Sequence, residues 1–258
     1  MELQGRTALV TGFAGAIGSV IAKSLANAGC DVIGVDKVKH DIVRMSIDEI
    51  KAESKRDLKY FQCDLLNKED IHKVFQDLKS GDVDILVNAA GRLSINRVED
   101  LSDDVWDEDI GVNLTAPFVL IKLVIGLMKE KGWGRIINIS SSLGIKATGS
   151  ISSYIASKTG LIGLTRAVAV ECADKGVTCN AICPTVVDTP FITSFMEHQQ
   201  KATGKSYEET KEAARQSHPT KQFTTPEQIA DLVVFLCSPE GQNMTGTAIP
   251  IDGGITIA

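Results

Sequence analysis

Short runs of aliphatic and β-branched residues alternate with helix-length segments along the whole 258-residue chain. The runs that we expect to form strands are 7–10, 31–35, 58–62, 85–87, 135–139, 178–182 and 248–251. The helix-length segments are 17–28, 68–78, 116–131, 153–173 and 226–236. Strands that alternate with helices in this way form right-handed crossovers, which build a mostly parallel sheet covered on both faces. The sequence therefore predicts a doubly wound α/β fold.

No linker rich in proline, serine or charge interrupts the series, so we expect residues 1–258 to form a single domain. The segment from about 190 to 223 fits the alternation worst, because it is polar, contains Gly204 and carries a charge-rich run at 207–212. Long segments that follow strand ends in open α/β sheets often hold ligands. We therefore predict a partly helical lid over the substrate. The alternative is a solvated helical hairpin with no role in binding.

The charge balance and the apolar stretches exclude several classes of partner. Lys and Arg number 27 and Asp and Glu 33, for a net charge of −6, which disfavours nucleic-acid binding because that requires cations to neutralise phosphates. The apolar stretch 116–128 contains Lys122 and is shorter than the roughly 20 residues of a membrane span. The first residues lack the apolar core of a secretory signal. We expect a cytoplasmic protein with no nucleic-acid or membrane partner, whose six cysteines are buried thiols.

A glycine-containing turn follows the first expected strand and leads directly into a helix. It comprises Gly12, Gly15, Ala16, Ile17 and Gly18. Glycine lets the backbone approach a pyrophosphate, and the helix N-terminus stabilises the phosphate charge. Taken alone, such a turn is equally typical of simple strand-to-helix packing.

An acidic residue at the end of the second expected strand strengthens the dinucleotide interpretation. Asp36 lies eighteen residues after Gly18, where a carboxylate accepts hydrogen bonds from ribose hydroxyls and would repel a 2′-phosphate. NAD is therefore favoured over NADP, although Lys37 and Lys39 weaken this preference.

Two further turns follow expected strands and supply candidate cofactor contacts. Asp64 and Leu65 follow the third strand, and Asn88, Ala89 and Gly91 follow the fourth. We expect Asp64 to meet the adenine amino group and the small residues to lie against the cofactor. Each feature alone is also ordinary turn chemistry.

The strongest indication of catalysis is a tyrosine followed four residues later by a lysine on a helix-forming stretch. This spacing places Tyr154 and Lys158 on one helix face. A phenol titrates near pH 10, so it needs a shift of about 2 to 3 units to act as a base at neutral pH. A cation at about 4 Å supplies that much, so we predict that Lys158 lowers the pKa of Tyr154. Ser141, at a strand end, is expected to hold a substrate oxygen. The alternative for the pair of Tyr154 and Lys158 is a surface tyrosine that packs along the lysine side chain without a role in catalysis.

Together these segments resemble the short-chain dehydrogenase/reductase family over essentially the whole chain. The matching pieces, in order, are 11–18, Asp64, 88–91, Asn113, Ser141, Tyr154 with Lys158, and 184–189. The resemblance implies that Ser141 orients the carbonyl or alcohol, that Tyr154 exchanges its proton, and that Lys158 lowers the pKa of Tyr154 and binds the nicotinamide ribose.

The resemblance also implies roles for residues outside the central group. Asn113 would hold a water that connects Lys158 to solvent, and Pro184, Val187 and Thr189 would contact the nicotinamide end. A homotetramer is implied through the helices matching 116–131 and 153–173. The chain departs from the family pattern at Ala16 and Thr185, which both stand where glycine is usual. Thr185 loses the freedom for positive φ that glycine has.

Within the family, the stretches 134–139, 177–184 and 223–227 are similar to D-3-hydroxybutyrate dehydrogenases. The resemblance implies that those enzymes grip a small carboxylate with Gln, His, Lys and Gln side chains. At these positions this chain has apolar residues, which are Leu93, Leu143, Ile151 and Phe195. A buried carboxylate without partners is strongly disfavoured. We therefore predict a neutral, fairly apolar secondary alcohol or ketone as the substrate, unless Arg92 or Lys146 turns inward to receive an anion.

Several functions remain open at this stage. The leading prediction is an NAD-dependent alcohol dehydrogenase or ketone reductase. The alternatives are an NADP-linked carbonyl or 3-oxoacyl reductase, a hydroxy-acid dehydrogenase, and a nucleotide sensor that has lost catalysis. We expect no metal site, because His40, His72, His198 and His218 show no ligand spacing.

Overall fold

All strands of the sheet are parallel, and their order shows how the chain winds. The computed structural model describes residues 3–78 and 83–258. Its seven-stranded sheet has the order β3-β2-β1-β4-β5-β6-β7, so the winding direction reverses between β1 and β4. Ligands of such sheets bind outside the carboxyl ends of the strands at this switch point. The strands are β1 (Thr7–Thr11), β2 (Asp31–Asp36), β3 (Leu58–Gln62), β4 (Ile85–Asn88), β5 (Gly134–Ile139), β6 (Val177–Pro184) and β7 (Ala248–Ile251).

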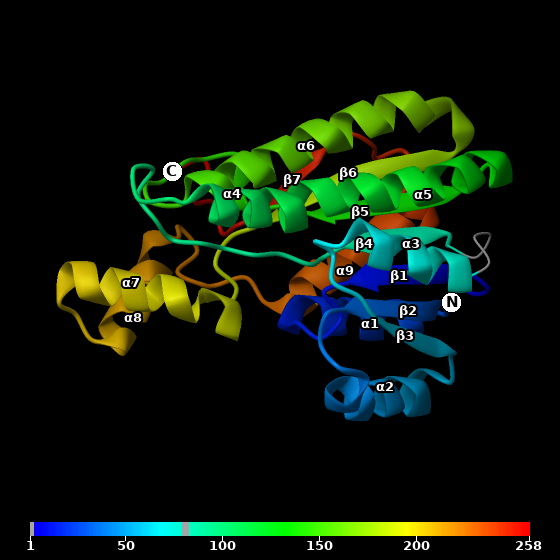
Figure 1. The fold of residues 1–258 in the computed structure, drawn as a ribbon, viewed down its shortest axis with the longest axis horizontal. Coiled ribbons are helices and arrows are strands. Elements are labelled where there is room, and N and C mark those ends of the chain that lie inside the picture. Colours follow the sequence, from blue (N-terminus) through cyan, green and yellow to red (C-terminus); the bar gives the residue numbers. More distant parts are fainter. Residues whose placement is uncertain (1–2, 79–82) are drawn as a thin grey trace.

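Helices cover both faces of the sheet, which confirms the doubly wound prediction (Figure 1). One layer contains α1 (Ala16–Asn27), α2 (His40–Ser54) and α9 (Pro226–Cys237); the other contains α3 (Lys68–Asp77), α4 (Asp103–Ile110), α5 (Ala116–Lys131) and α6 (Ser152–Cys172). A hydrophobic cluster lies between each layer and the sheet. All six cysteines are buried and free, as expected.

The seven strands and the five predicted helices each begin and end within two residues of their predicted bounds. The helices α2 and α4 were not predicted from the sequence. Along α2 the buried residues are Val43, Ile47 and Ile50, a narrow apolar stripe in an otherwise polar segment. Along α4 the buried residue is Asp109, so hydrophobic periodicity gives no indication of this helix.

The helix that follows the switch point is long and unusually wound. The segment Asp103–Lys131 is long and apolar enough to span a bilayer by length and composition alone. Within the fold, however, α5 packs against β4 and β5, and its residues Leu120, Val124 and Met128 belong to a core cluster. Between α4 and α5 lies a π-helical turn, Gly111–Thr115, a feature that often marks functional sites.

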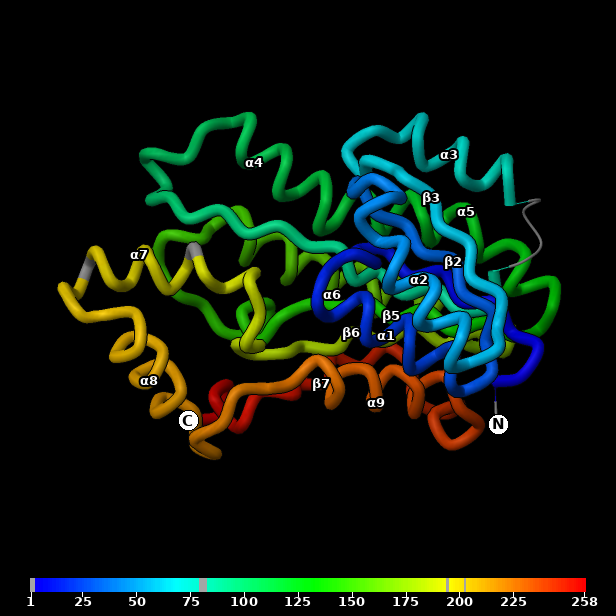
Figure 2. Tube along the Cα trace, turned by 90° about the horizontal axis from the view of Figure 1, so that it is seen from below, coloured from blue at the N-terminus to red at the C-terminus, as the bar shows by residue number. Residues whose placement is uncertain are grey.

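The segment predicted as a lid forms two helices that project beyond the sheet (Figure 2). These are α7 (Thr193–Thr203) and α8 (Tyr207–Ser217), which pack against each other. A capping box between Ser206 and Glu209 fixes the start of α8. The helical part of the prediction is thus confirmed, while a covering role over substrate stays a prediction.

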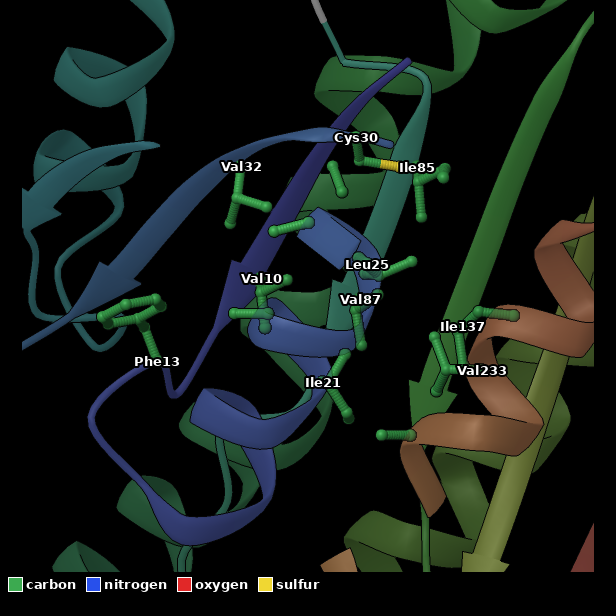
Figure 3. Packing of buried hydrophobic residues seen from close by; sticks show 14 of the residues in the cluster. Val10, Phe13, Ile21, Leu25, Cys30, Val32, Ile85, Val87, Ile137 and Val233 are labelled. Carbon is green, nitrogen blue, oxygen red and sulfur yellow. The ribbon is translucent and has the colours of Figure 1, made fainter. Parts of the chain in front are cut away.

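One buried aromatic residue fixes the turn between β1 and α1. Phe13 is fully buried and lies on this turn near β2 (Figure 3). A Cβ added to Gly34 would lie 2.6 Å from the Phe13 ring, so β2 requires glycine at this point. The Phe13 ring also lies 5.6 Å, between centroids, from that of Tyr60. The glycine turn is therefore held on the sheet by core packing.

We expect Phe13→Ala to lower the free energy of unfolding by about 3–5 kcal/mol, because it leaves a cavity beside Gly34. Urea denaturation followed by circular dichroism measures this change. Met45→Ala is the control, since Met45 is 84% exposed and should change stability by less than about 0.5 kcal/mol. Equal effects of the two substitutions would contradict the anchoring role of Phe13.

Candidate active site

The glycine turn lies at the carboxyl edge of the sheet and fits a pyrophosphate. Gly12 has a φ of +68°, and a Cβ on Gly12 would lie 2.8 Å from the backbone of Ala90. A Cβ on Gly18 would lie 2.1 Å from the carbonyl oxygen of Gly12, so both positions require glycine. Within the described residues, the first turn of α1 has no side-chain cap and no acidic residue. Its N–H groups and dipole are therefore suited to an anion.

The other residues of the turn leave that edge accessible. Gly15 caps α1, and its N–H donates to the Gly12 carbonyl oxygen at 2.9 Å. Ala16 is exposed at the first helical position, and Ile17 is half-buried against the core. The methyl group of Ala16 therefore meets no packing conflict inside the chain.

Asp36 lies beside the glycine turn, where the sequence placed it. Its Oδ2 accepts a hydrogen bond from the N–H of Ala14 at 3.0 Å, and its Oδ1 accepts one from the N–H of Val38 at 3.2 Å. These two bonds hold a carboxylate at the carboxyl end of β2. Lys37 and Lys39 are exposed.

The end of β4 is held by β1 and β5. The Thr11 hydroxyl oxygen accepts hydrogen bonds from the N–H groups of Ala89 and Ala90 at 3.1 and 3.2 Å. Asn88 Nδ2 donates to Asn138 Oδ1 at 2.8 Å, whereas the buried Asn88 Oδ1 has no partner within the described residues. These contacts fix the strand end that borders the switch point.

Gly91 leaves room next to the lysine of the site. A Cβ on Gly91 would lie 3.7 Å from Lys158 Nζ and 3.6 Å from Asn113 Oδ1. Gly91 therefore lies directly beside the buried ammonium, and a methyl group there would be in ordinary van der Waals contact with it. Together with the α1 N-terminus and Asp36, this arrangement fits a dinucleotide along the carboxyl edge.

The turn after β3 is explained by local structure. Asp64 Oδ1 accepts a hydrogen bond from the N–H of Leu66 at 3.0 Å. This bond is common where an aspartate begins a turn. Leu65 packs against a core cluster. The adenine contact expected of Asp64 stays a prediction.

Ser141, Tyr154 and Lys158 meet at the carboxyl ends of β5 and β6. Tyr154 and Lys158 are buried one turn apart on α6, and Lys158 Nζ lies 5.7 Å from the centroid of the Tyr154 ring. Lys158 Nζ donates to the carbonyl oxygen of Ile139, the last residue of β5, at 2.8 Å. Ser141 lies two residues after the end of this strand, and its Oγ accepts a hydrogen bond from the N–H of Leu143 at 3.1 Å.

Asn113 lies on the π-helical turn and ties two parts of the site together. Its Oδ1 accepts the N–H of Arg92 at 2.9 Å, and its Nδ2 donates to the carbonyl oxygen of Arg92 at 2.9 Å. Nδ2 also donates to Ser157 Oγ at 3.0 Å. The Asn113 side chain therefore joins the loop after β4 to α6, and its role toward a water stays a prediction.

The structure corrects the prediction that Lys158 lowers the pKa of Tyr154. Burial raises the pKa of Tyr154 to about 12, against the opposite effect of a hydrogen bond with Ser141, and the Asp109 charge raises it further. Burial also lowers the pKa of Lys158 to about 8. Lys158 bonds to Ile139 rather than to the phenol, and desolvation sets the direction of the Tyr154 pKa. Tyr154 keeps its proton at neutral pH.

The nicotinamide loop, which we define as residues 184–189, is held by the segment that follows the lid. Val187 forms an isolated parallel bridge with Thr224, and Thr189 Oγ1 donates to the carbonyl oxygen of Val187 at 3.3 Å. Pro184 ends β6. Thr185 does not occupy the left-handed region, which among described residues other than glycine holds Lys55, Ser150 and Lys221. The expected difficulty with φ at Thr185 is therefore absent.

The predicted substrate-lining residues are not all brought together. A cleft of about 330 Å³ is lined by Leu93 and Ile95 from the loop after β4, and by Glu197, His198 and Lys201 from α7. Of the other predicted lining residues, Leu143 and Phe195 are half-buried. Ile151 is 1% exposed and bridges to Asn96. The polar residues of α7 were missed, because the lid sequence carries no motif that assigns a helix face to the cleft.

Asp109 was also missed by the sequence analysis, although it is buried beside the site. It accepts hydrogen bonds from Arg92 Nε at 2.9 Å, Ser94 Oγ at 2.9 Å and Ser153 Oγ at 2.6 Å. It therefore fixes the loop after β4 against the residue that precedes Tyr154. It lies in the acidic segment 103–109, where nothing in the local sequence distinguishes a buried carboxylate from its neighbours.

The two cations considered as anion receptors are both engaged elsewhere. Arg92 pairs with Asp109 at 2.9 Å and also with Glu108. Lys146 Nζ donates to the carbonyl oxygen of Ile255 at 3.0 Å. Two carboxylates neutralise Arg92, so it is poorly suited to bind an anionic substrate.

The buried Lys158 should cost stability in a pH-dependent way. Its pKa falls from 10.5 to about 8, which corresponds to about 3 kcal/mol for burying the charge. Because the unfolded chain holds this proton more tightly, the cost is fully present below pH 8 and disappears above about pH 10. We expect Lys158→Met to raise the free energy of unfolding by about 1–3 kcal/mol at pH 7. This range already allows for loss of the hydrogen bond to Ile139, and the increase should be smaller at pH 10.

Urea denaturation at the two pH values measures this difference, with Lys205→Met in the exposed α7–α8 loop as the control. If Lys158→Met lowered the free energy of unfolding equally at both pH values, the result would contradict a desolvated ammonium at this position.

The chain is similar to known oxidoreductases over nearly its whole length. A family model described as enoyl-(acyl carrier protein) reductase matches residues 12–256. The chain is 37% identical to a D-beta-hydroxybutyrate dehydrogenase of Rhizobium meliloti, over 97% of this chain and 98% of that protein. It is 34% identical to a 3-oxoacyl-(acyl-carrier-protein) reductase of Vibrio harveyi, over 99% of each.

A solved structure shares the fold. A variant of actinorhodin polyketide ketoreductase with NADPH is 32% identical and has a TM-score of 0.92 to this chain, over 98% of each chain. The sequence motifs, the strand order and the similarity to this structure all indicate the same family. The chain belongs to the short-chain dehydrogenase/reductase family and is an oxidoreductase that uses a nicotinamide cofactor.

Proposed function

We propose that the chain interconverts a neutral, fairly apolar secondary alcohol and its ketone with NAD(H), using Tyr154 as general acid and base. The observation that carries this proposal is the convergence of Ser141, Tyr154 and Lys158 next to Gly91 at the switch point of the sheet. When bound, the nicotinamide supplies the acceptor or donor of hydride. The chain supplies binding, orientation and the proton.

The protonation state of Tyr154 suits ketone reduction at neutral pH. With a pKa of about 12, its hydroxyl is a proton donor that holds its proton until a developing alkoxide takes it. Ser141 would orient the same substrate oxygen through its hydroxyl. In the reverse direction Tyr154 must accept a proton, so alcohol oxidation is favoured by higher pH. Lys158, whose ammonium borders the space at Gly91, would donate hydrogen bonds to the ribose.

The predicted lining residues and Arg92 favour a neutral substrate, whereas Lys201, which lines the cleft from α7, favours an anion. The predicted lining residues Leu93, Leu143, Ile151 and Phe195 offer no partner for a carboxylate, and Arg92 is neutralised by Glu108 and Asp109. A hydroxy acid remains the second candidate, favoured by 37% identity to a D-beta-hydroxybutyrate dehydrogenase. The 3-oxoacyl thioester is a third, favoured by the reductase relative.

NAD is the preferred cofactor in this proposal. The Asp36 carboxylate is fixed beside the glycine turn by the N–H groups of Ala14 and Val38. At that place it would accept bonds from ribose hydroxyls and repel a 2′-phosphate. NADP is the alternative, favoured by exposed Lys37 and Lys39 and by the NADPH of the ketoreductase structure.

A panel of alcohols tests the reaction and the substrate class. We expect neutral secondary alcohols such as 2-alkanols and cyclohexanols to exceed 3-hydroxybutyrate in kcat/KM by about 100-fold or more, since an unpaired buried carboxylate costs several kcal/mol. Tyr154→Phe should lower kcat by about 10²–10⁴-fold. Absorbance of the reduced cofactor reports both.

Tyr207→Phe removes the same hydroxyl from the lid and serves as the matched control, with kcat unchanged. A micromolar KM for 3-hydroxybutyrate would reject the neutral substrate, and full activity of Tyr154→Phe would remove Tyr154 from the reaction.

Cofactor preference depends on Asp36 in this proposal. We expect Asp36→Asn to shift the ratio of the Kd for NADP to the Kd for NAD by about 10-fold toward NADP, because it removes the charge that repels the 2′-phosphate. Titration calorimetry with both cofactors measures the ratio. Asp41→Asn, which removes an equal charge on the exposed first turn of α2, should leave it unchanged. No shift in Asp36→Asn would refute the role of Asp36.

A further inference from the structure

A buried histidine joins the lid to the nicotinamide loop. His218 follows α8 directly and is 0% exposed. Its Nδ1 lies 2.8 Å from the carbonyl oxygen of Ala214, in the last turn of α8. Its Nε2 lies 2.8 Å from Thr185 Oγ1. Because a carbonyl oxygen only accepts, Nδ1 of the neutral ring carries the proton, and the Thr185 hydroxyl donates to Nε2.

Further contacts around His218 connect the segment after α8 to the nicotinamide loop. The His218 ring packs edge-on against Phe223, with centroids 5.6 Å apart. The next residue, Thr224, donates its N–H to the carbonyl oxygen of Val186 at 3.2 Å and bridges to Val187. The segment that leaves the lid therefore runs along the nicotinamide loop and holds it at two successive residues.

A second contact between the lid and the loop is weaker. Lys211 of α8 pairs with Asp188 of the loop at 2.7 Å, but both side chains are partly exposed. Exposed ion pairs contribute little because water and salt screen them. The bond between His218 and Thr185 joins a fully buried ring to a half-buried hydroxyl, and removing the hydroxyl leaves a buried ring nitrogen unsatisfied. The bond between His218 and Thr185 is thus the stronger connection between α8 and the loop.

We propose that His218 and Thr185 are positioning residues that lock the nicotinamide loop to lid helix α8, so that the loop is held ready for the nicotinamide end of the cofactor. This inference rests on the proposed function. It also gives Thr185 a purpose, since the glycine that the family usually has at this position offers no hydroxyl to the histidine.

Binding of NADH and of ADP-ribose to the full chain separates positioning from general stability. ADP-ribose lacks the nicotinamide, so it reports on the rest of the cofactor site. We expect Thr185→Val, which keeps the shape and removes the hydroxyl, to raise the Kd of NADH about 5- to 20-fold. The Kd of ADP-ribose should change by less than about 2-fold, since its site does not involve the nicotinamide loop.

Conservative and matched variants complete the test. Thr185→Ser retains a hydroxyl and should bind NADH nearly as the wild type does. Thr203→Val, at an exposed threonine of α7, should change neither Kd. In nitrogen-15 spectra of His218, Nδ1 should carry the proton in the wild type.

Three results would overturn the inference. They are an unchanged Kd of NADH in Thr185→Val, an equal rise for NADH and ADP-ribose, and an Nε2-protonated His218. Full activity of Tyr154→Phe would instead overturn the proton role of Tyr154 and leave the comparison of NADH with ADP-ribose intact. A wild-type chain that bound neither ligand would overturn both proposals.

Discussion

Desolvation of two neighbouring ionisable groups governs the chemistry at the carboxyl edge of this sheet. Burial raises the pKa of Tyr154 to about 12 and lowers that of Lys158 to about 8, so each group is biased toward its neutral form. The neutral phenol is a proton donor, and the ammonium is held by a carbonyl oxygen of β5. The fold bears the cost of this burial, as expected where pKa values are tuned for function.

The topology brings the remaining parts of the site to the same edge. Reversal of the winding between β1 and β4 places the glycine turn, Asp36 and Gly91 along the carboxyl edge of the sheet. Buried polar contacts then fix the loops: Asp109 ties the loop after β4 to α6, and His218 ties the lid to the loop after β6. The helix α6 thus carries Tyr154 and Lys158, while loops held by hydrogen bonds are left to recognise ligands.

Much of this arrangement could be predicted from the sequence, because strands and core helices have clear apolar patterns and the reactive residues lie at strand ends and on a helix face. The helix α2, with its narrow apolar stripe, and α4, with a single buried carboxylate, lack such patterns. Asp109, Thr185 and His218 act through contacts between distant segments, which local spacing does not show. The pKa of Tyr154 was predicted in the wrong direction because spacing shows the cation and not the burial. The tetramer and the cytoplasmic location stay predictions.

The proposed chemistry depends most on the protonated state of Tyr154, and a direct titration measures this state. The chain has three tyrosines, so the signal of Tyr154 in carbon-13 spectra of ring-labelled protein is assigned by its loss in Tyr154→Phe. Without added cofactor, we predict that this phenol stays protonated up to about pH 11, consistent with a pKa of about 12. Ionisation of Tyr154 near pH 7 would show that the ammonium of Lys158 outweighs desolvation, and would contradict the account.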